Sequence, residues 1–143
     1  MDYTWIIFAL LSAFTAALVA IFGKMGLQGI DTNTATAIRA GIMFLFLMGL
    51  ILIQGKLNDI RPILLNSRTL FYIVLSGIAG ALSWLFYFVA LKNAKVSQIV
   101  PIDRLSIVFA ILLAFFILGE KISIKAGIGA ALVVVGAVLI ALG

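Results

Sequence analysis

The stretch TNTATAIRAGIMFLFLMGLILI, residues 32–53, decides the fold of this chain. It is apolar over most of its length, and about 20 mainly apolar residues are enough for one α-helix to cross the hydrocarbon core of a bilayer. Asp31 precedes the stretch as a helix N-cap, and a polar segment begins at Gln54. Arg39 is the one charged residue inside it. The stretch therefore predicts a transmembrane helix that carries a cation.

Four further stretches of the same character flank this one. They are residues 3–25, 70–91, 97–118 and 124–142. Residue types common at helix ends separate the stretches, at Gly26-Leu27-Gln28-Gly29, Lys92-Asn93-Ala94-Lys95 and Gly119-Glu120-Lys121. The longest break, residues 54–68, contains Arg61-Pro62 and is predicted to be a loop. We predict an all-α integral membrane protein with five transmembrane helices, organised as one domain over residues 1–143.

The composition supports lipid as the solvent. Hydrophobic residues make up 65% of the chain, against roughly 45–50% in an ordinary globular protein. Charged residues make up 10%, against roughly 25%. A water-soluble fold of this size has too little interior to hide that much apolar surface, so no water-soluble domain is expected.

Several classes of chemistry are disfavoured by what the chain does not contain. It has no Cys and no His, so disulfides, thiolate chemistry and ordinary zinc sites are not expected. Lys and Arg are scattered singly despite a net charge of +5, which gives nucleic-acid binding no basis. No span holds paired carboxylates, and no Gly-rich phosphate loop occurs. The prediction is that the protein is not an enzyme and has no cofactor and no metal site.

The orientation in the membrane is only weakly indicated. The start Met-Asp-Tyr-Thr-Trp is acidic, which argues against a cleaved signal peptide. Loops on the N-terminal side carry five cations against three on the other side: Lys56, Arg61, Arg68, Lys121 and Lys125 against Lys24, Lys92 and Lys95. The difference in loop cations sets the orientation of a membrane protein. A difference of five against three is small, so two interpretations remain open. Either one orientation is adopted, or copies insert both ways and pair as an antiparallel dimer.

Three ionisable residues, Arg39, Asp103 and Arg104, lie inside predicted spans. Such groups are costly in lipid and usually face a protein interior or water. A rise of about 1.5 Å per residue places each of them about 9–10 Å into its span. Both spans start on the same side, so all three groups belong to one leaflet. They form a polar substrate site in one interpretation. In the other, Arg39 and Asp103 form a structural pair, or the arginines reach the headgroups.

Other residues in the third and fourth spans also have two interpretations. Pro101 breaks a membrane helix and frees backbone groups, or it lies in the first turn of a helix that starts later. Trp84 and Tyr87 share one helix face and form the wall of a substrate site, or they pack and mark the interface. Glu120 is interpreted as an interfacial carboxylate beside Lys121.

A family resemblance is carried by an ordered set of segments from residue 77 to 143. They are Ala90-Leu91-Lys92 after an aromatic helix, Val100-Pro101-Ile102-Asp103, Leu118-Gly119-Glu120-Lys121 and the glycine-rich GIGAALVVVG at 127–136. In these the chain resembles an EamA-type domain of the drug/metabolite transporter superfamily. The resemblance implies five spans forming one half of an inverted-repeat transporter fold, since most members carry two such domains around a central cavity.

The resemblance and the polar residues together give the functional prediction. The chain is expected to be a multi-pass protein of the cell (inner) membrane that acts as a secondary transporter, with efflux of a small metabolite or amino-acid-like solute. Its expected partners are lipid, a small-molecule substrate and a second copy of the chain in a homodimer, which is antiparallel in the dual-topology interpretation. The predicted substrate-binding residues are Arg39, Asp103, Arg104, Trp84 and Tyr87, with Pro101 as a helix break or hinge. The alternatives are a small dual-topology dimeric channel and a non-transporting subunit of a membrane assembly.

Overall fold

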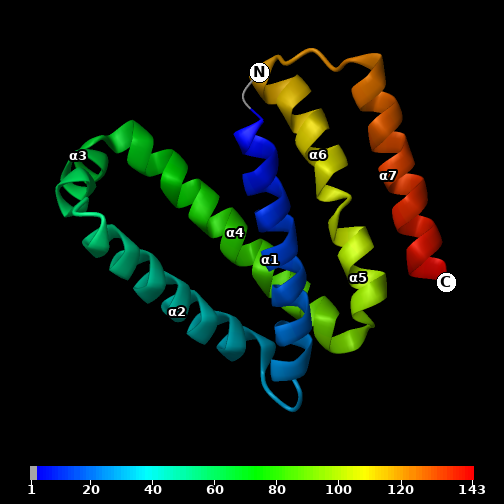
Figure 1. Cartoon of the computed structure of the whole chain (residues 1–143), viewed down its shortest axis with the longest axis horizontal. Coiled ribbons are helices and arrows are strands. Elements are labelled where there is room, and N and C mark those ends of the chain that lie inside the picture. Colours follow the sequence, from blue (N-terminus) through cyan, green and yellow to red (C-terminus); the bar gives the residue numbers. More distant parts are fainter. Residues whose placement is uncertain (1–2) are drawn as a thin grey trace. The chain divides into compact units, whose positions relative to one another are not determined.

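The computed structural model describes residues 3–143, so Met1 and Asp2, on which the expectation about a signal peptide partly rests, lie outside the described residues. Within residues 3–143 the regular structure is helical, and Figure 1 labels its elements. The elements are α1 (Thr4–Gly26), α2 (Thr32–Ile53), η1 (Leu57–Asp59), α3 (Ile60–Leu65), α4 (Ser67–Asn93), α5 (Val96–Asp103), α6 (Ser106–Leu113), η2 (Ala114–Leu118) and α7 (Ile124–Leu142). They form two compact units, described separately below: residues 3–25 with 93–143, and residues 26–92.

The five predicted spans are confirmed as helices long and apolar enough to cross a membrane. The second and fifth begin and end at the predicted residues, as α2 and α7. The third is longer than predicted and begins at Ser67 rather than residue 70. The Asn66 side chain accepts a hydrogen bond from the Thr69 amide at 3.1 Å, and this N-cap adds a polar turn that an apolar pattern does not mark.

The helix ends use the polar residues and glycines that the sequence indicated. Asp31 caps α2, with its carboxylate accepting hydrogen bonds from the Thr34 amide and hydroxyl, both at 2.8 Å. Gly119 ends the fourth span with a φ of +70°, a left-handed conformation that side chains with a Cβ rarely adopt. The Asp31 cap begins α2 and Gly119 ends the fourth span, at points where the chain turns.

The segment 54–68, predicted to be a loop, is partly helical, so that prediction was wrong. It contains the 3₁₀ turn η1 and the short helix α3. Pro62 lies in the first turn of α3, where proline is tolerated because the amide it lacks would have no helical partner. A proline and charged residues made the segment resemble a loop, although a helix of six residues accommodates them.

In the unit of residues 26–92, α2 and α4 run in opposite directions and are joined through η1 and α3 (Figure 1). The Lys92 ammonium, in the last turn of α4, donates a hydrogen bond to the Ile30 carbonyl at 3.1 Å. This bond ties the end of α4 to the turn that precedes α2. The unit is therefore a helical hairpin closed at the end where α2 starts.

In the unit of residues 3–25 and 93–143, α5 and α7 pack against each other. The Gln98 side chain donates a hydrogen bond to the Ala141 carbonyl at 3.4 Å, and Ile99 and Ala137 are buried. The Lys24 ammonium at the end of α1 donates to the Ala94 carbonyl at 2.8 Å. The small side chain of Ala137 lies buried where α5 and α7 pack, and small residues are common where helices pack in lipid.

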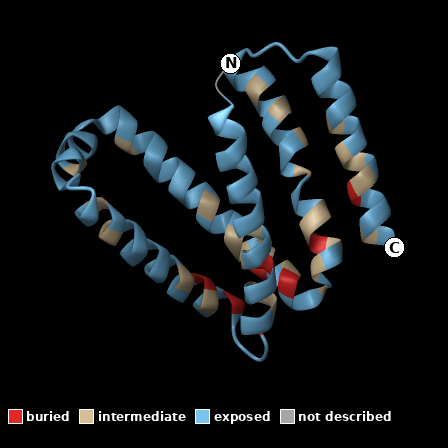
Figure 2. Ribbon diagram, in the orientation of Figure 1, coloured by how far each residue is buried: buried red, intermediate tan, exposed pale blue. Residues whose placement is uncertain are grey.

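Most residues are exposed, as the pale blue ribbon in Figure 2 shows, and they include most of the large apolar side chains. Phe46 and Phe116 expose 72% and 75% of their surface. Among residues 3–143 the buried apolar side chains are only Ala20, Leu27, Phe88, Leu91, Ile99 and Ala137. Water would not tolerate so large an apolar surface, so lipid or other protein surfaces cover it.

The cap at Asp31 generates a prediction about pH. The hydrogen bond from the Thr34 amide, which favours the charged form, holds the pKa of Asp31 below its usual range. The contribution of the cap to stability is then complete above the unfolded-state pKa of about 3.9 and is lost as the pH falls through the folded-state pKa. We expect D31A to lower the melting temperature of the detergent-solubilised protein by about 2–5 °C at pH 7, and by less as the pH approaches 3.

The matched control is D59A, because Asp59 precedes α3 without a capping side-chain hydrogen bond. Thermal unfolding of both variants and of the unsubstituted protein, measured from pH 7 to 3, checks the prediction. An equal effect of D59A and D31A at pH 7 would contradict it.

Candidate functional site

The centre of the candidate site is Arg39, which lies on α2 about 10 Å from the start of the helix, at a rise of about 1.5 Å per residue. Its guanidinium carbon lies 3.6 Å from the centroid of the Trp84 ring and 5.3 Å from that of Phe88. Both rings come from α4. The hairpin of α2 and α4 thus places a cation on an aromatic surface inside a membrane span.

Three aromatic side chains of α4 form the wall of this site. Trp84 contacts Tyr87 edge to face at a centroid distance of 5.5 Å, and contacts Phe88 in the same way at 5.7 Å. Trp84 and Tyr87 are partly buried, while Phe88 is 3% exposed. Residues three and four apart share a helix face, which explains why these rings meet. Arg39, Trp84 and Tyr87 were predicted as site residues, and the structure gathers them in one unit.

Phe88 was not predicted as a site residue. It lies four residues after Trp84 and adjacent to Tyr87, so helical spacing from Trp84 was a usable signal. The chain has 11 phenylalanines, however, and nothing in the sequence distinguishes this one as buried. Only the position of α2 across the hairpin marks Phe88 as part of the cation's surroundings.

The guanidinium of Arg39 is held by ring faces rather than by hydrogen bonds. Within residues 26–92 its N–H groups donate none to a described residue. A cation over an aromatic face gains about 0.5–2 kcal/mol, more when water is excluded. The five N–H donors of the guanidinium lie in its plane, so a contact made by its carbon over the ring face does not require any of them. The group can therefore bind an anion through its edge.

Asp103 and Arg104 lie in the other unit, at an interruption of the fourth span. Here α5 ends at Asp103 and α6 begins at Ser106. The intervening bonds are tightened, with the Leu105 amide donating to the Ile102 carbonyl at 3.0 Å. Both charged side chains are exposed, and neither forms an ion pair with a described residue of that unit. They belong to a different unit from Arg39, and a site that combines all three residues stays a prediction.

Pro101 lies inside α5, which begins at Val96, and so not in the first turn of a later helix. It cannot donate to the carbonyl one turn earlier, and the helix is interrupted after Asp103. Pro101 also lines an apolar pocket of about 360 Å³. The other lining residues are Ala17, Ala20, Ile21, Val96, Ser97, Val100 and Ile140. The fourth span therefore combines an irregular backbone with an adjacent open space.

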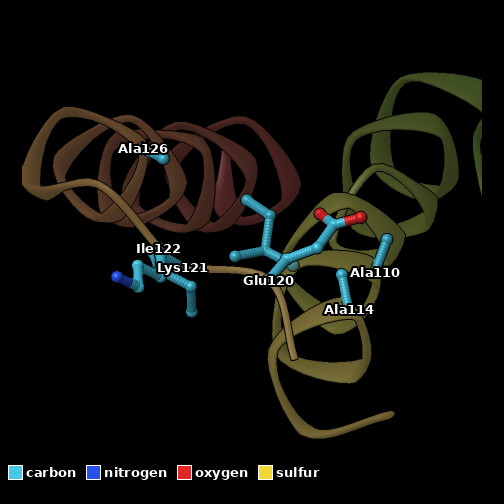
Figure 3. Close-up of a pocket in the computed structure, with 7 residues that line it drawn as sticks. Ala110, Ala114, Glu120, Lys121, Ile122 and Ala126 are labelled. Atoms are coloured by element: carbon cyan, nitrogen blue, oxygen red, sulfur yellow. The ribbon is translucent and has the colours of Figure 1, made fainter. Parts of the chain in front are cut away.

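Glu120 lines a second pocket, of about 310 Å³, which the sequence did not indicate. Figure 3 shows its carboxylate directed towards Ala110 of α6 and Ala114 of η2, whereas the Lys121 side chain points away. The π-helical turn η2 and Gly119 precede it, and the Glu120 amide donates to the Ala114 carbonyl at 3.2 Å. Helical turns of this type recur at functional positions.

The five membrane helices, with a cation stacked on aromatic rings inside one of them, define a multi-pass membrane protein with a candidate solute-binding group. The sequence profile of the EamA-like transporter family matches residues 3–142. The chain belongs to this family and is a membrane transporter, so the predicted resemblance is confirmed.

Two relatives are similar over nearly the whole chain. A Sinorhizobium sp protein, described as an uncharacterized transporter in the cobO 3' region, is 36% identical over 141 residues, covering 99% of this chain and 99% of that protein. GDP-fucose transporter 1 of Dictyostelium discoideum is 30% identical over 146 residues, covering 95% of this chain and 39% of that protein. No solved structure matches the chain.

The interruption of the fourth span generates a prediction. P101A supplies a backbone N–H that can donate to the Ser97 carbonyl, and it removes the proline ring. We expect hydrogen exchange of the amides of residues 97–105 to slow by about tenfold or more, because an interior proline weakens a helix by about 3 kcal/mol. Exchange measured by mass spectrometry in detergent checks this.

P62A is the matched control, since Pro62 lies in the first turn of α3. It is expected to leave exchange in α3 unchanged. Unaltered exchange around position 101 in P101A would show that Pro101 does not control the interruption.

Proposed function

We propose that the protein is a secondary transporter for small metabolites that carry a carboxylate or another anionic group, with efflux as its direction. The observation that carries the proposal is the Arg39 guanidinium, stacked 3.6 Å over Trp84 inside a span with its N–H edge unused within its unit. An unpaired cation is expensive in lipid. It is tolerated where an anionic solute or water can reach it, which is the requirement of a substrate site.

The name of one relative supports an anionic solute. GDP-fucose, the solute in the name of the Dictyostelium protein, carries its negative charge on phosphate groups. Arginine is suited to such groups because its planar fork binds carboxylate or phosphate through two parallel hydrogen bonds. In the proposal Arg39 is the anion anchor, and Trp84 and Tyr87 are wall residues.

The proposal assigns the remaining predicted residues to the interrupted fourth span. Asp103 is the carboxylate that can exchange a proton, and Arg104 is a second cation beside the solute path. Pro101 is the hinge position. Irregular backbone at membrane depth is tolerated where it lines a cavity, and the apolar pocket beside Pro101 supports this assignment.

The working unit in this proposal is a homodimer in which residues 1–143 act as one five-helix domain. The chain aligns with 39% of the length of the Dictyostelium relative, and a second copy would supply a comparable number of spans. The extensive exposed apolar surface offers room for such contacts. An antiparallel pair would reproduce the inverted-repeat symmetry of many secondary transporters, with the copies inserted in opposite orientations in the cell membrane.

Transport itself is tested with purified protein in liposomes. We expect saturable counterflow of radiolabelled succinate or glutamate, and a loss of at least about tenfold in the initial rate for R39Q, since the anchor is removed. R61Q, on α3 and outside the spans, should retain the unsubstituted rate. A flux that rises linearly with solute concentration would indicate a channel instead, and an equal rate for R39Q and R61Q would remove Arg39 from the mechanism.

Dual topology is tested by labelling, because the chain has no cysteine. N58C lies in η1, and Q28C lies in the turn between α1 and α2, on the opposite side of a span. With a membrane-impermeant maleimide on intact cells, we expect about half of each variant to be labelled before permeabilisation. Full labelling of one variant with none of the other would establish a single orientation and eliminate the antiparallel homodimer.

A further inference from the structure

The contact between Arg39 and the aromatic cluster has a geometry that charge alone does not require. A guanidinium needs only nearby negative potential, yet this one lies 3.6 Å above the centroid of the indole ring. That distance is close to van der Waals contact, so the indole limits where the guanidinium can move. Phe88, at 5.3 Å, restricts it from a second direction.

The aromatic surface is itself fixed in place. Phe88 is 3% exposed, and its ring meets Trp84 with an interplanar angle of 78°. Tyr87 meets Trp84 from another direction with an interplanar angle of 85°. The indole therefore has neighbours on α4 that limit its rotation. Because the ring cannot rotate freely, the guanidinium in contact with its face is restricted in orientation as well.

The geometry points to Trp84 as a positioning residue that holds the Arg39 guanidinium flat, so that its N–H edge binds an oxyanion through two oxygens at once. The ligand class is then a carboxylate or phosphate presenting two oxygens, as opposed to anions with a single point of contact such as chloride. The inference deepens the proposed function and rests on it for the identification of the ligand as a transported solute. It goes further than the proposed function in two respects. It assigns the preference for two-oxygen anions over chloride to the indole of Trp84, and it requires arginine rather than any cation at position 39.

Lysine serves as the comparison that isolates this role. Its ammonium is a compact point charge without a plane, so it keeps the attraction to the ring and to an anion but cannot form the two parallel bonds. Leucine at position 84 keeps apolar volume but has no ring face. Phenylalanine at the same position keeps a face, although a weaker one than indole.

A fluorescence titration reads the site directly. The chain has two tryptophans, Trp5 and Trp84, so W5F leaves Trp84 as the sole indole reporter beside the cation. The purified variant in dodecyl maltoside, a detergent without phosphate, is titrated with succinate and with inorganic phosphate, using chloride at equal ionic strength as the control. We expect a saturable change in emission with succinate and phosphate and none with chloride. In W5F/R39K the midpoint should rise by about tenfold or more.

The role of the ring is measured by anion-dependent thermal stabilisation, which does not need tryptophan. The succinate concentration that gives half-maximal stabilisation should rise by about 2- to 30-fold in W84L, as expected for the loss of a cation–π contact. In W84F the shift should be smaller. F86L is the matched control, since Phe86 lies on the same helix and is 70% exposed, and it should behave as the unsubstituted protein.

The outcomes separate this inference from the proposed transport function. Equal midpoints for W5F and W5F/R39K, or equal succinate dependence for W84L and F86L, would overturn the positioning role even if transport is observed. A response to chloride equal to that to succinate would overturn the two-oxygen ligand. A response only to phosphatidylglycerol added in nanodiscs would overturn the assignment to a soluble solute. Saturable succinate binding in a protein that transports nothing would uphold the site and refute the proposed function.

Discussion

The hydrocarbon core of a bilayer offers no water to a peptide group, so every backbone N–H and C=O inside it has to find a partner within the protein. The five spans meet this constraint as helices, and their ends follow from it. Asp31 and Asn66 satisfy amides at helix starts, while Gly119 lets the chain leave a helix. The interruption between α5 and α6 departs from regular helical bonding within a span. It coincides with Asp103 and Arg104, so polar side chains accompany the irregular backbone.

The same absence of water gives Arg39 its importance. A charge in this environment needs compensation, and α4 supplies ring faces rather than a carboxylate within the unit of residues 26–92. Aromatic faces stabilise the cation without occupying its hydrogen-bond donors. A salt bridge would hold the side chain equally well but would use the fork that an anionic solute needs. In the proposed mechanism, the ring faces hold Arg39 and leave its N–H donors to the solute.

The exposed surface follows from a chain whose apolar residues surround its helices instead of lying on one face. Helices that are apolar all round cannot bury all of their side chains in so small a protein. Phe46 and Phe116, which are largely exposed, are examples. Lipid accounts for much of this surface. Membership of a transporter family, together with a relative of which the chain covers 39%, is the reason to assign part of the surface to a second copy in the proposed dimer.

The number of spans, both ends of two of them, the caps and the family were determined by the sequence, because hydropathy and capping act over a few neighbouring residues. Arg39, Trp84 and Tyr87 were recognised as unusual for the same reason, since a charge or a pair of aromatic residues in a span is visible locally. The stacking of Arg39 on Trp84, the participation of Phe88, the pocket at Glu120 and the helix α3 were decided only by the tertiary structure. The first three depend on how separate segments approach one another, and α3 is a short helix without an apolar repeat. Such features leave no periodic signal along the chain.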